Sequence, residues 1–153
     1  MVYQWKGASR IKADANEAAK IMNGLAERNA LTAEMLVEVS RPETALLHHE
    51  FEWDDTKAAN EYRKVQARNI INALVVVPDE KIPATEPVRA YFQIETKGNR
   101  YTQLTTIMSN PTQKEMLLKK ALSELNAFSH KYSTLHELAD VMQSIESALI
   151  MYS

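Results

Sequence analysis

The stretch VRAYFQIETKGNRYTQLTTI, residues 88–107, decides the fold class. Its first eight residues alternate along the chain, which predicts a strand with one face on the core. The residues expected on that face are Val88, Ala90, Phe92 and Ile94. TKGN (96–99) contains a glycine and predicts a turn, so RYTQLTTI (100–107) should return as an antiparallel partner strand. Upstream, the apolar run ALVVV (73–77) predicts a further strand.

Helices are predicted before this sheet. Alanine, methionine and leucine recur at helical spacing from about residue 13 to 28, and Asn29 suits the position after the last turn. Thr32 can cap a short second helix. That helix should end near Ser40, because Pro42 disfavours helical geometry at the residue before it. An ordered loop then leads into a third helix over about residues 55–73.

The C-terminal third of the chain is predicted to be helical, with Asn110 as its N-cap and Pro111 in its first turn. Apolar residues then follow a seven-residue repeat, which is typical of a coiled-coil seam. The predicted seam consists of Leu118, Ala121, Leu125, Phe128, Tyr132, Leu135, Ala139 and Met142. SHKYST (129–134) favours helix caps, and Thr134 with Glu137 could start a new helix. Residues 111–152 therefore form either one long helix or a helical hairpin.

The expected fold class is α+β. It combines N-terminal helices, a small antiparallel sheet of about three strands, and the C-terminal long helix or hairpin with its heptad-like seam. The chain should divide into an α+β domain over residues 1–109 and a coiled-coil-like helical segment over residues 110–153. A seam left in water would expose more apolar surface than a soluble monomer usually tolerates. We therefore expect a homo-oligomer, with internal helix packing as the alternative.

Composition argues against several classes of function. The chain has no cysteine, which removes disulfides, thiolate zinc sites and thiol nucleophiles and favours a reducing cytoplasm. Its three glycines lie far apart, so a P-loop or a dinucleotide fingerprint is absent. A net charge of −2 argues against a general nucleic-acid coat. The longest apolar run is too short to span a bilayer, and the first residues lack a signal-peptide core, so we expect no membrane association.

The stretch HHEFEWDD (48–55) is the strongest candidate for a chemical site. In an extended segment His48, Glu50 and Glu52 would share one face and could bind a divalent metal or act in acid–base catalysis. No further ligand motif is recognisable. Asp54 is a favoured N-cap for the third helix, and Asp55 would lie in its first turn. We therefore interpret the stretch as a helix entry and expect no catalytic residue, metal or cofactor.

The third helix is also a candidate DNA-recognition helix. The possible nucleic-acid contacts are Lys57, Arg63, Lys64 and Arg68 on that helix and Lys97 and Arg100 in the predicted hairpin, in a winged-helix-like arrangement. The loop over residues 41–53 is much longer than the tight turn of a helix-turn-helix, and Glu61 lies among the cations. A solvated charged face is the favoured interpretation, and DNA binding remains the alternative.

A resemblance adds context to this interpretation. It is carried by LVEVSRPE (36–43), LHHEFEWDD (47–55), YRKVQARNII (62–71), WKGASRIKADANEAAKIM (5–22) and ALSELNAFSHKYSTLHELADVM (121–142), which together cover nearly the whole chain. These segments resemble a family of small uncharacterised proteins encoded by bacteriophages and prophages of Gram-positive bacteria. TALLHH (44–49) departs from the family pattern, which has a small residue and a proline before Leu-His. The resemblance implies no functional residue; it implies an accessory or regulatory protein made in an infected bacterial cell.

The sequence therefore predicts a non-enzymatic phage accessory protein that acts through protein contacts as a regulator or adaptor. The expected partners are a second copy of the chain and a phage or host protein, in the cytoplasm of the infected host. The alternative is a DNA-binding regulator that uses the third helix and the basic hairpin. An enzyme ranks third, because no pair of nucleophile and base stands out.

Overall fold

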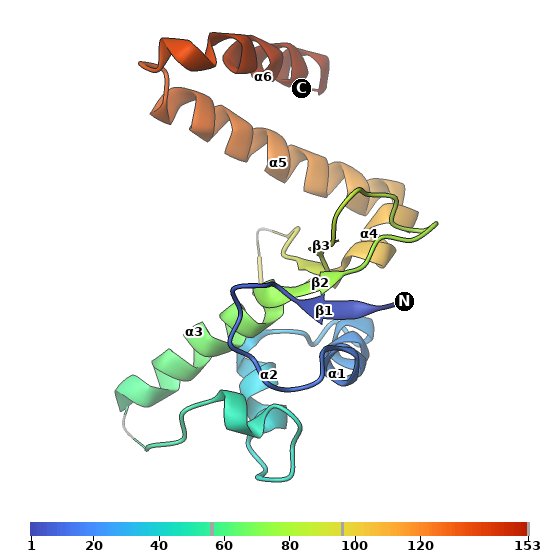
Figure 1. Ribbon diagram of the computed structural model, residues 1–153, viewed down its shortest axis with the longest axis vertical. Helices are drawn as coiled ribbons and strands as arrows, with labels where there is room; N and C mark the ends of the chain where they lie inside the picture. Colours follow the sequence, from blue (N-terminus) through green and yellow to red (C-terminus); the bar gives the residue numbers. More distant parts are fainter. Residues whose placement is uncertain (56, 96, 153) are drawn as a thin grey trace. The chain divides into compact units, whose positions relative to one another are not determined.

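The computed structural model describes residues 1–55, 57–95 and 97–152. Within these residues the chain is α+β, with six α-helices, a three-stranded antiparallel sheet and a two-stranded sheet (Figure 1). It divides into two compact units, unit 1 over Met1–Ser109 and unit 2 over Asn110–Ser153. None of the helices described is long and apolar enough to cross a membrane.

The first two helices of unit 1 form where local capping predicts them. Helix α1 spans Ala15–Glu27, and Asn29 follows it in the left-handed conformation, with φ 54°. Helix α2 spans Ala33–Ser40, and the Thr32 hydroxyl accepts a hydrogen bond from the N–H of Met35 at 3.0 Å. The predictions for Asn29, Thr32 and the end of α2 at Ser40 are confirmed.

Two small sheets follow the third helix, α3 (Lys57–Ala73). Strand β2 (Leu74–Val76) lies in the middle of the first sheet. It pairs antiparallel with β1 (Tyr3–Trp5) on one side and with β3 (Val88–Arg89) on the other. The expected small antiparallel sheet is confirmed.

The second sheet confirms the predicted antiparallel pairing within residues 88–107 and corrects the length of both strands. The first predicted strand is interrupted at Ala90, after which β4 (Tyr91–Phe92) pairs with β5 (Thr102–Gln103) instead of with β2. Ala90 links the first sheet to the residue after β5: its N–H donates to the Leu74 carbonyl at 3.1 Å, and its carbonyl accepts from the N–H of Leu104 at 2.8 Å. Residues Leu104–Ser109 form helix α4, so the second predicted strand ends after two residues.

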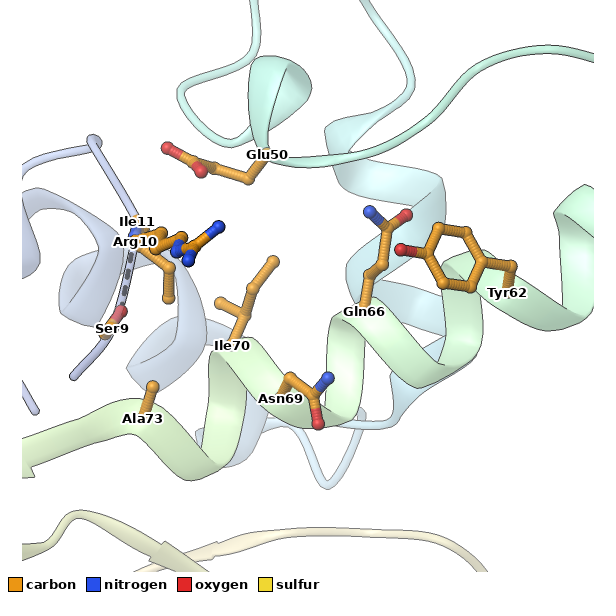
Figure 2. A pocket seen from close by; sticks show the side chains of 9 residues that line it. All are labelled: Ser9, Arg10, Ile11, Glu50, Tyr62, Gln66, Asn69, Ile70 and Ala73. Atoms are coloured by element: carbon orange, nitrogen blue, oxygen red, sulfur yellow. Dashed lines mark hydrogen bonds between the residues drawn. The ribbon is translucent and has the colours of Figure 1, made fainter.

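The segment between β1 and α1 lies beside α3 (Figure 2). The N–H of Lys6 donates to the carbonyl of Ala73 at 2.9 Å, at the C-terminal end of α3. Further along, the backbone N–H groups of Lys12 and Ala13 both donate to Oε1 of Glu50 at 2.9 Å. Glu50 belongs to a 3₁₀ turn, η1 (His48–Glu50), in the loop before α3. We call residues 6–13 the arm; hydrogen bonds from backbone N–H groups at both of its ends connect it to the rest of unit 1.

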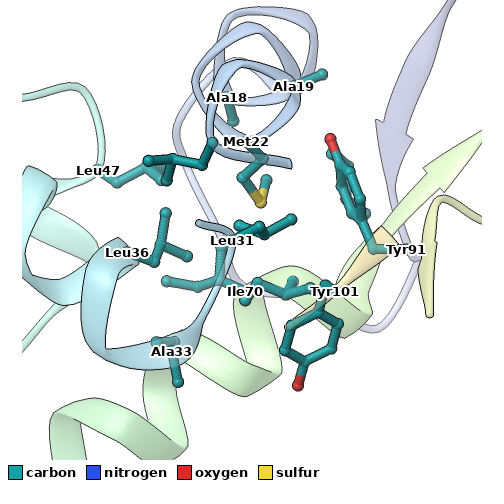
Figure 3. Packing of buried hydrophobic residues seen from close by; sticks show 14 of the residues in the cluster. Ala18, Ala19, Met22, Leu31, Ala33, Leu36, Leu47, Ile70, Tyr91 and Tyr101 are labelled. Atoms are coloured by element: carbon teal, nitrogen blue, oxygen red, sulfur yellow. The ribbon is translucent and has the colours of Figure 1, made fainter. Parts of the chain in front are cut away.

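The core of unit 1 lies where the helices and the sheets meet. Met22 of α1, Leu36 of α2 and Leu31 of the connection between them are fully buried. Leu47 from the loop and Tyr91 from β4 pack into the same cluster (Figure 3). Side chains from five separate segments thus cover one another, which is how a small domain buries an apolar core.

Unit 2 is a helical hairpin rather than one long helix. Helix α5 (Pro111–Lys131) begins at the predicted cap, where the Asn110 side chain accepts from the N–H groups of Thr112 and Gln113 at 3.0 and 3.2 Å. A 3₁₀ turn, η2 (His136–Leu138), leads into helix α6 (Ala139–Tyr152), which contacts α5. Thr134 is not the N-cap that was predicted. The N-cap position before η2 is occupied by Leu135, which makes no side-chain capping hydrogen bond.

Candidate interaction surface

The hairpin of unit 2 buries very little. Among residues 110–152, Leu122 of α5 and Ile145 of α6 are buried, at 8% and 6% exposure. Leu122 faces α6, because it lines a shallow cavity together with Leu149 and Tyr152. The two helices therefore contact each other along one line of side chains, and most of their remaining surface faces outward.

The predicted seam is not one continuous stripe. Leu118, Ala121, Leu125, Phe128 and Tyr132 are spaced three or four residues apart, so they share one side of α5. The turn then reverses the chain direction. Leu135, Ala139 and Met142 consequently line a groove of about 510 Å³ between α5 and α6, which we call the hairpin groove. The expectation of one eight-residue seam is wrong, because the chain folds back inside it.

The five seam residues on α5 belong to an exposed apolar face. They do not line the hairpin groove, whose α5 side is formed by polar residues such as Asn126, Ser129 and His130. Leu118, Leu125 and Phe128 remain 39%, 38% and 38% exposed. The rings of Phe128 and Tyr132 lie 5.0 Å apart between centroids, which places both on the same side of the helix.

Helix α6 contributes to the same face. Its groove-lining residues, Ala139, Met142 and Glu146 among them, lie on one side of Ile145. At 100° per residue, Val141 and Met151 fall on the other side of Ile145, and they are 48% and 72% exposed. The exposed and half-buried residues on this side of both helices define what we call the apolar face: Leu118, Ala121, Leu125, Phe128, Tyr132, Val141, Ala148 and Met151.

The side chains of the stretch HHEFEWDD (48–55) make contacts within unit 1 that hold the loop before α3 in place. The rings of His48 and Trp53 stack 4.9 Å apart at an angle of 7°. Nδ1–H of His48 donates to the Ser40 carbonyl at 3.0 Å, and Nε1–H of Trp53 donates to the His48 carbonyl at 2.7 Å. Glu50 anchors the arm, as described above. No three of the described His, Asp and Glu side chains lie close enough together to hold a metal ion.

The predicted helix entry needs one correction. Helix α3 begins at Lys57, three residues after Asp54, so Asp54 is not at the N-cap position. Asp54 contributes its carbonyl instead, which accepts a hydrogen bond from the Arg63 guanidinium at 3.1 Å. The half-buried Gln66 side chain fixes the same loop, because its Oε1 accepts the N–H of Glu52 at 3.1 Å.

Arg63 was assigned to the possible nucleic-acid surface, and the structure places it elsewhere. Its side chain is 3% exposed. The guanidinium donates to the Glu52 carbonyl at 2.6 Å and lies 5.0 Å from the centre of the Trp53 ring. Arg63 therefore holds the loop against α3 and is not available to a phosphate. Its spacing of four from the buried Ala67 was the sequence signal that could have predicted this burial.

The other candidate nucleic-acid contacts do not form one positive surface. Lys64 is paired with Glu61 at 3.1 Å and with Glu34 at 4.0 Å. The side chains of Arg68, Lys97 and Arg100 are exposed. The side chain of Lys57 lies outside the described residues.

Comparison with known proteins adds no functional assignment. No protein-family model, curated protein or solved structure matches the chain. A function is therefore proposed from the chemistry of the chain's own surfaces.

Proposed function

We propose that the protein is a non-enzymatic interaction protein that pairs with a second copy of itself through the apolar face of unit 2. The observation that carries this proposal is the exposure of Leu118, Leu125 and Phe128, each above one third, on a helical hairpin. The described part of that hairpin buries two side chains, Leu122 and Ile145.

A free hairpin of this kind has little to stabilise it. Isolated helices of about 12–15 residues are marginal in water, and chains below roughly 40–70 residues seldom build a sufficient core without a staple or a partner. Covering apolar surface contributes roughly 25 cal/mol per Å². A second hairpin placed on the apolar face would cover Leu125 and Phe128 with side chains of the same kind, as in a four-helix bundle.

The charges of unit 2 favour a second copy as the partner. Helix α5 carries four lysines, Lys114, Lys119, Lys120 and Lys131, against Glu115 and Glu124, which gives a net charge of +2. The segment from η2 through α6 carries Glu137, Asp140 and Glu146 and no lysine or arginine, which gives −3. In a twofold pair, α5 of each copy can pack against α6 of the other, so opposite charges meet twice.

The cellular setting of the proposal comes from the resemblance. A self-associating accessory protein in the cytoplasm of a phage-infected bacterium would act as a regulator or adaptor for a phage or host protein, without a cofactor. DNA binding has less support, because Arg63 is buried and Lys64 is paired with two carboxylates.

The test compares two leucines of similar exposure, Leu125 on the apolar face at 38% and Leu135 in the hairpin groove at 44%. Leu125→Glu should convert a dimer into a monomer, because a buried unpaired charge costs several times the thermal energy. Leu135→Glu, the matched control, should leave the dimer intact. Sedimentation velocity at about 10–100 μM resolves the two states for a Kd near 1 μM. A wild-type monomer in that range, or dissociation by Leu135→Glu alone, contradicts the proposal.

A further inference from the structure

Unit 1 contains a second surface that the self-association does not use. A groove of about 480 Å³ runs between the arm and α3, and we call it the arm groove (Figure 2). Arg10 and Glu50 line one wall, and Tyr62, Gln66 and Asn69 line the other, along α3. The volume lies within the range of about 300–1,000 Å³ that ligand sites occupy.

The walls of the arm groove are held in place without a ligand. Glu50 Oε1 accepts two N–H groups of the arm at 2.9 Å, and Ser9 Oγ accepts the N–H of Ile11 at 3.2 Å. Farther back, Nε1–H of Trp5 donates to the Ala13 carbonyl at 2.6 Å. A preformed groove loses little conformational entropy on binding, which favours affinity.

Polar groups in the groove remain open to a ligand. Among the residues that the structure describes, the side chains of Arg10, Tyr62 and Asn69 make no hydrogen bond or ion pair. Gln66 uses Oε1 to accept the N–H of Glu52, so its Nε2 donors are left over. Glu50 uses Oε1 for the arm and retains Oε2 as an acceptor. Figure 2 shows these side chains around one space, with Ile70 at its floor.

This lining fits an extended peptide. A side-chain amide such as Asn69 offers one acceptor and two donors, which match the C=O and N–H of a peptide group. The Arg10 guanidinium can bind a carboxylate with two parallel hydrogen bonds. Tyr62 to Ala73 covers about 16 Å of helix at 1.5 Å per residue, the length of about five extended residues.

A nucleic acid fits the same lining less well. Binding to phosphates requires several clustered cations. Among the described residues that line the arm groove, Arg10 is the one lysine or arginine, which can pair with a single carboxylate but cannot neutralise a run of phosphates. We propose that the arm groove binds an extended segment of a partner protein, with an acidic side chain of that segment paired to Arg10. This partner is distinct from the second copy that the apolar face would bind.

The test begins with a displayed library of random peptides of about seven residues, long enough to fill the groove. Sorting against the full chain should enrich peptides with one acidic position. The Kd of an enriched peptide is then measured by fluorescence anisotropy. Arg10→Glu should raise that Kd by about tenfold or more, the loss expected for a charge-assisted pair. Replacing the peptide's acidic residue by its amide should have the same effect on wild type and little effect on Arg10→Glu.

Lys12→Glu is the matched control. Lys12 is an exposed cation of the same arm that does not line the groove, so its reversal should change the Kd by less than about threefold. The proposal is overturned if no peptide is enriched, if Arg10→Glu binds like wild type, if Lys12→Glu weakens binding as much as Arg10→Glu, or if a dT oligonucleotide displaces the peptide. Leu125→Glu should bind the peptide normally, so failure of the self-association and failure of the groove proposal are distinguished.

Discussion

Both units contain helices with an apolar side, but these apolar side chains are buried in unit 1 and partly exposed in unit 2. In unit 1, Met22 of α1 and Leu36 of α2 are fully buried, because α3, the sheets and the loop containing Leu47 pack over them. In unit 2, Leu125 and Phe128 remain 38% exposed, because α6 packs against another side of α5 and does not cover them. An apolar stripe on a helix indicates that this side of the helix packs against other apolar residues. It does not indicate whether those residues come from the same chain or from another one.

The largest expected effect tests this contrast directly. Leu31→Ala removes a fully buried side chain from the core of unit 1 and should lower the free energy of unfolding by about 2–5 kcal/mol. Leu125→Ala in unit 2 should change it by less than about 0.5 kcal/mol in a dilute, unpaired chain, where the residue is exposed.

Urea unfolding at about 0.1 μM protein, well below the Kd near 1 μM so that most chains are unpaired, measures both variants. Both tryptophans, Trp5 and Trp53, lie in unit 1, so their fluorescence reports unit 1, and far-ultraviolet circular dichroism reports the helices of both units. An equal loss from the two alanine substitutions would show that unit 2 is as well packed as unit 1.

A smaller effect is expected from a single hydroxyl. Tyr91 is fully buried, and its O–H donates to Oδ1 of Asn23 on α1 at 2.7 Å. Tyr91→Phe leaves that oxygen without its partner inside unit 1, so it should destabilise by about 1–3 kcal/mol. The same measurement of urea midpoints checks it, with Tyr152→Phe, an exposed residue of unit 2, as the control. If Tyr91→Phe lowers the free energy of unfolding no more than the control does, the hydrogen bond does not stabilise unit 1.

The pH dependence of this residue has a definite sign. Burial raises the pKa of Tyr91 above its usual value of 10.0. Above about pH 10 the unfolded chain ionises its tyrosines while the folded chain keeps Tyr91 protonated, so unfolding is favoured as the pH rises further. Wild type should therefore lose stability between about pH 10 and 11, and Tyr91→Phe should lose less over the same interval.

The smallest effect is expected when unit 2 is removed. The fragment 1–109 keeps the whole buried cluster that includes Met22 and Leu31, so its free energy of unfolding, from fluorescence-monitored urea titration, should match that of the full chain within about 0.5 kcal/mol. The fragment should also sediment as a monomer. Failure of 1–109 to fold would show that the two units form a single cooperative domain.

Local features of the fold follow from residues that are close together in the chain. Asn29, Thr32 and Asn110 act within three residues of their own positions, so their roles at the helix ends could be predicted without a partner. The strand Leu74–Val76 was predictable for a related reason, since its short apolar run suits a strand buried on both faces.

Tertiary contacts decided what those local signals left open. The alternation of residues 88–95 places Tyr91 on the face opposite Ala90 and Phe92, but Tyr91 is buried, because its ring packs into the core of unit 1 and its hydroxyl donates to Asn23, 68 residues away. Arg63 was expected on a basic surface, and it is buried because the carbonyls of Glu52 and Asp54 need its donors.

The same division explains the candidate sites. Spacing alone identified the apolar residues of 118–142, but the turn after Tyr132 separates Leu135 from Leu125 and assigns them to different surfaces. The arm groove has no sequence signal at all, because Arg10 and Asn69 are brought together by hydrogen bonds between distant backbone segments and Glu50. Patterns over a few neighbouring residues indicate which side chains will be buried and which exposed. The packing of remote segments decides which of these side chains come into contact.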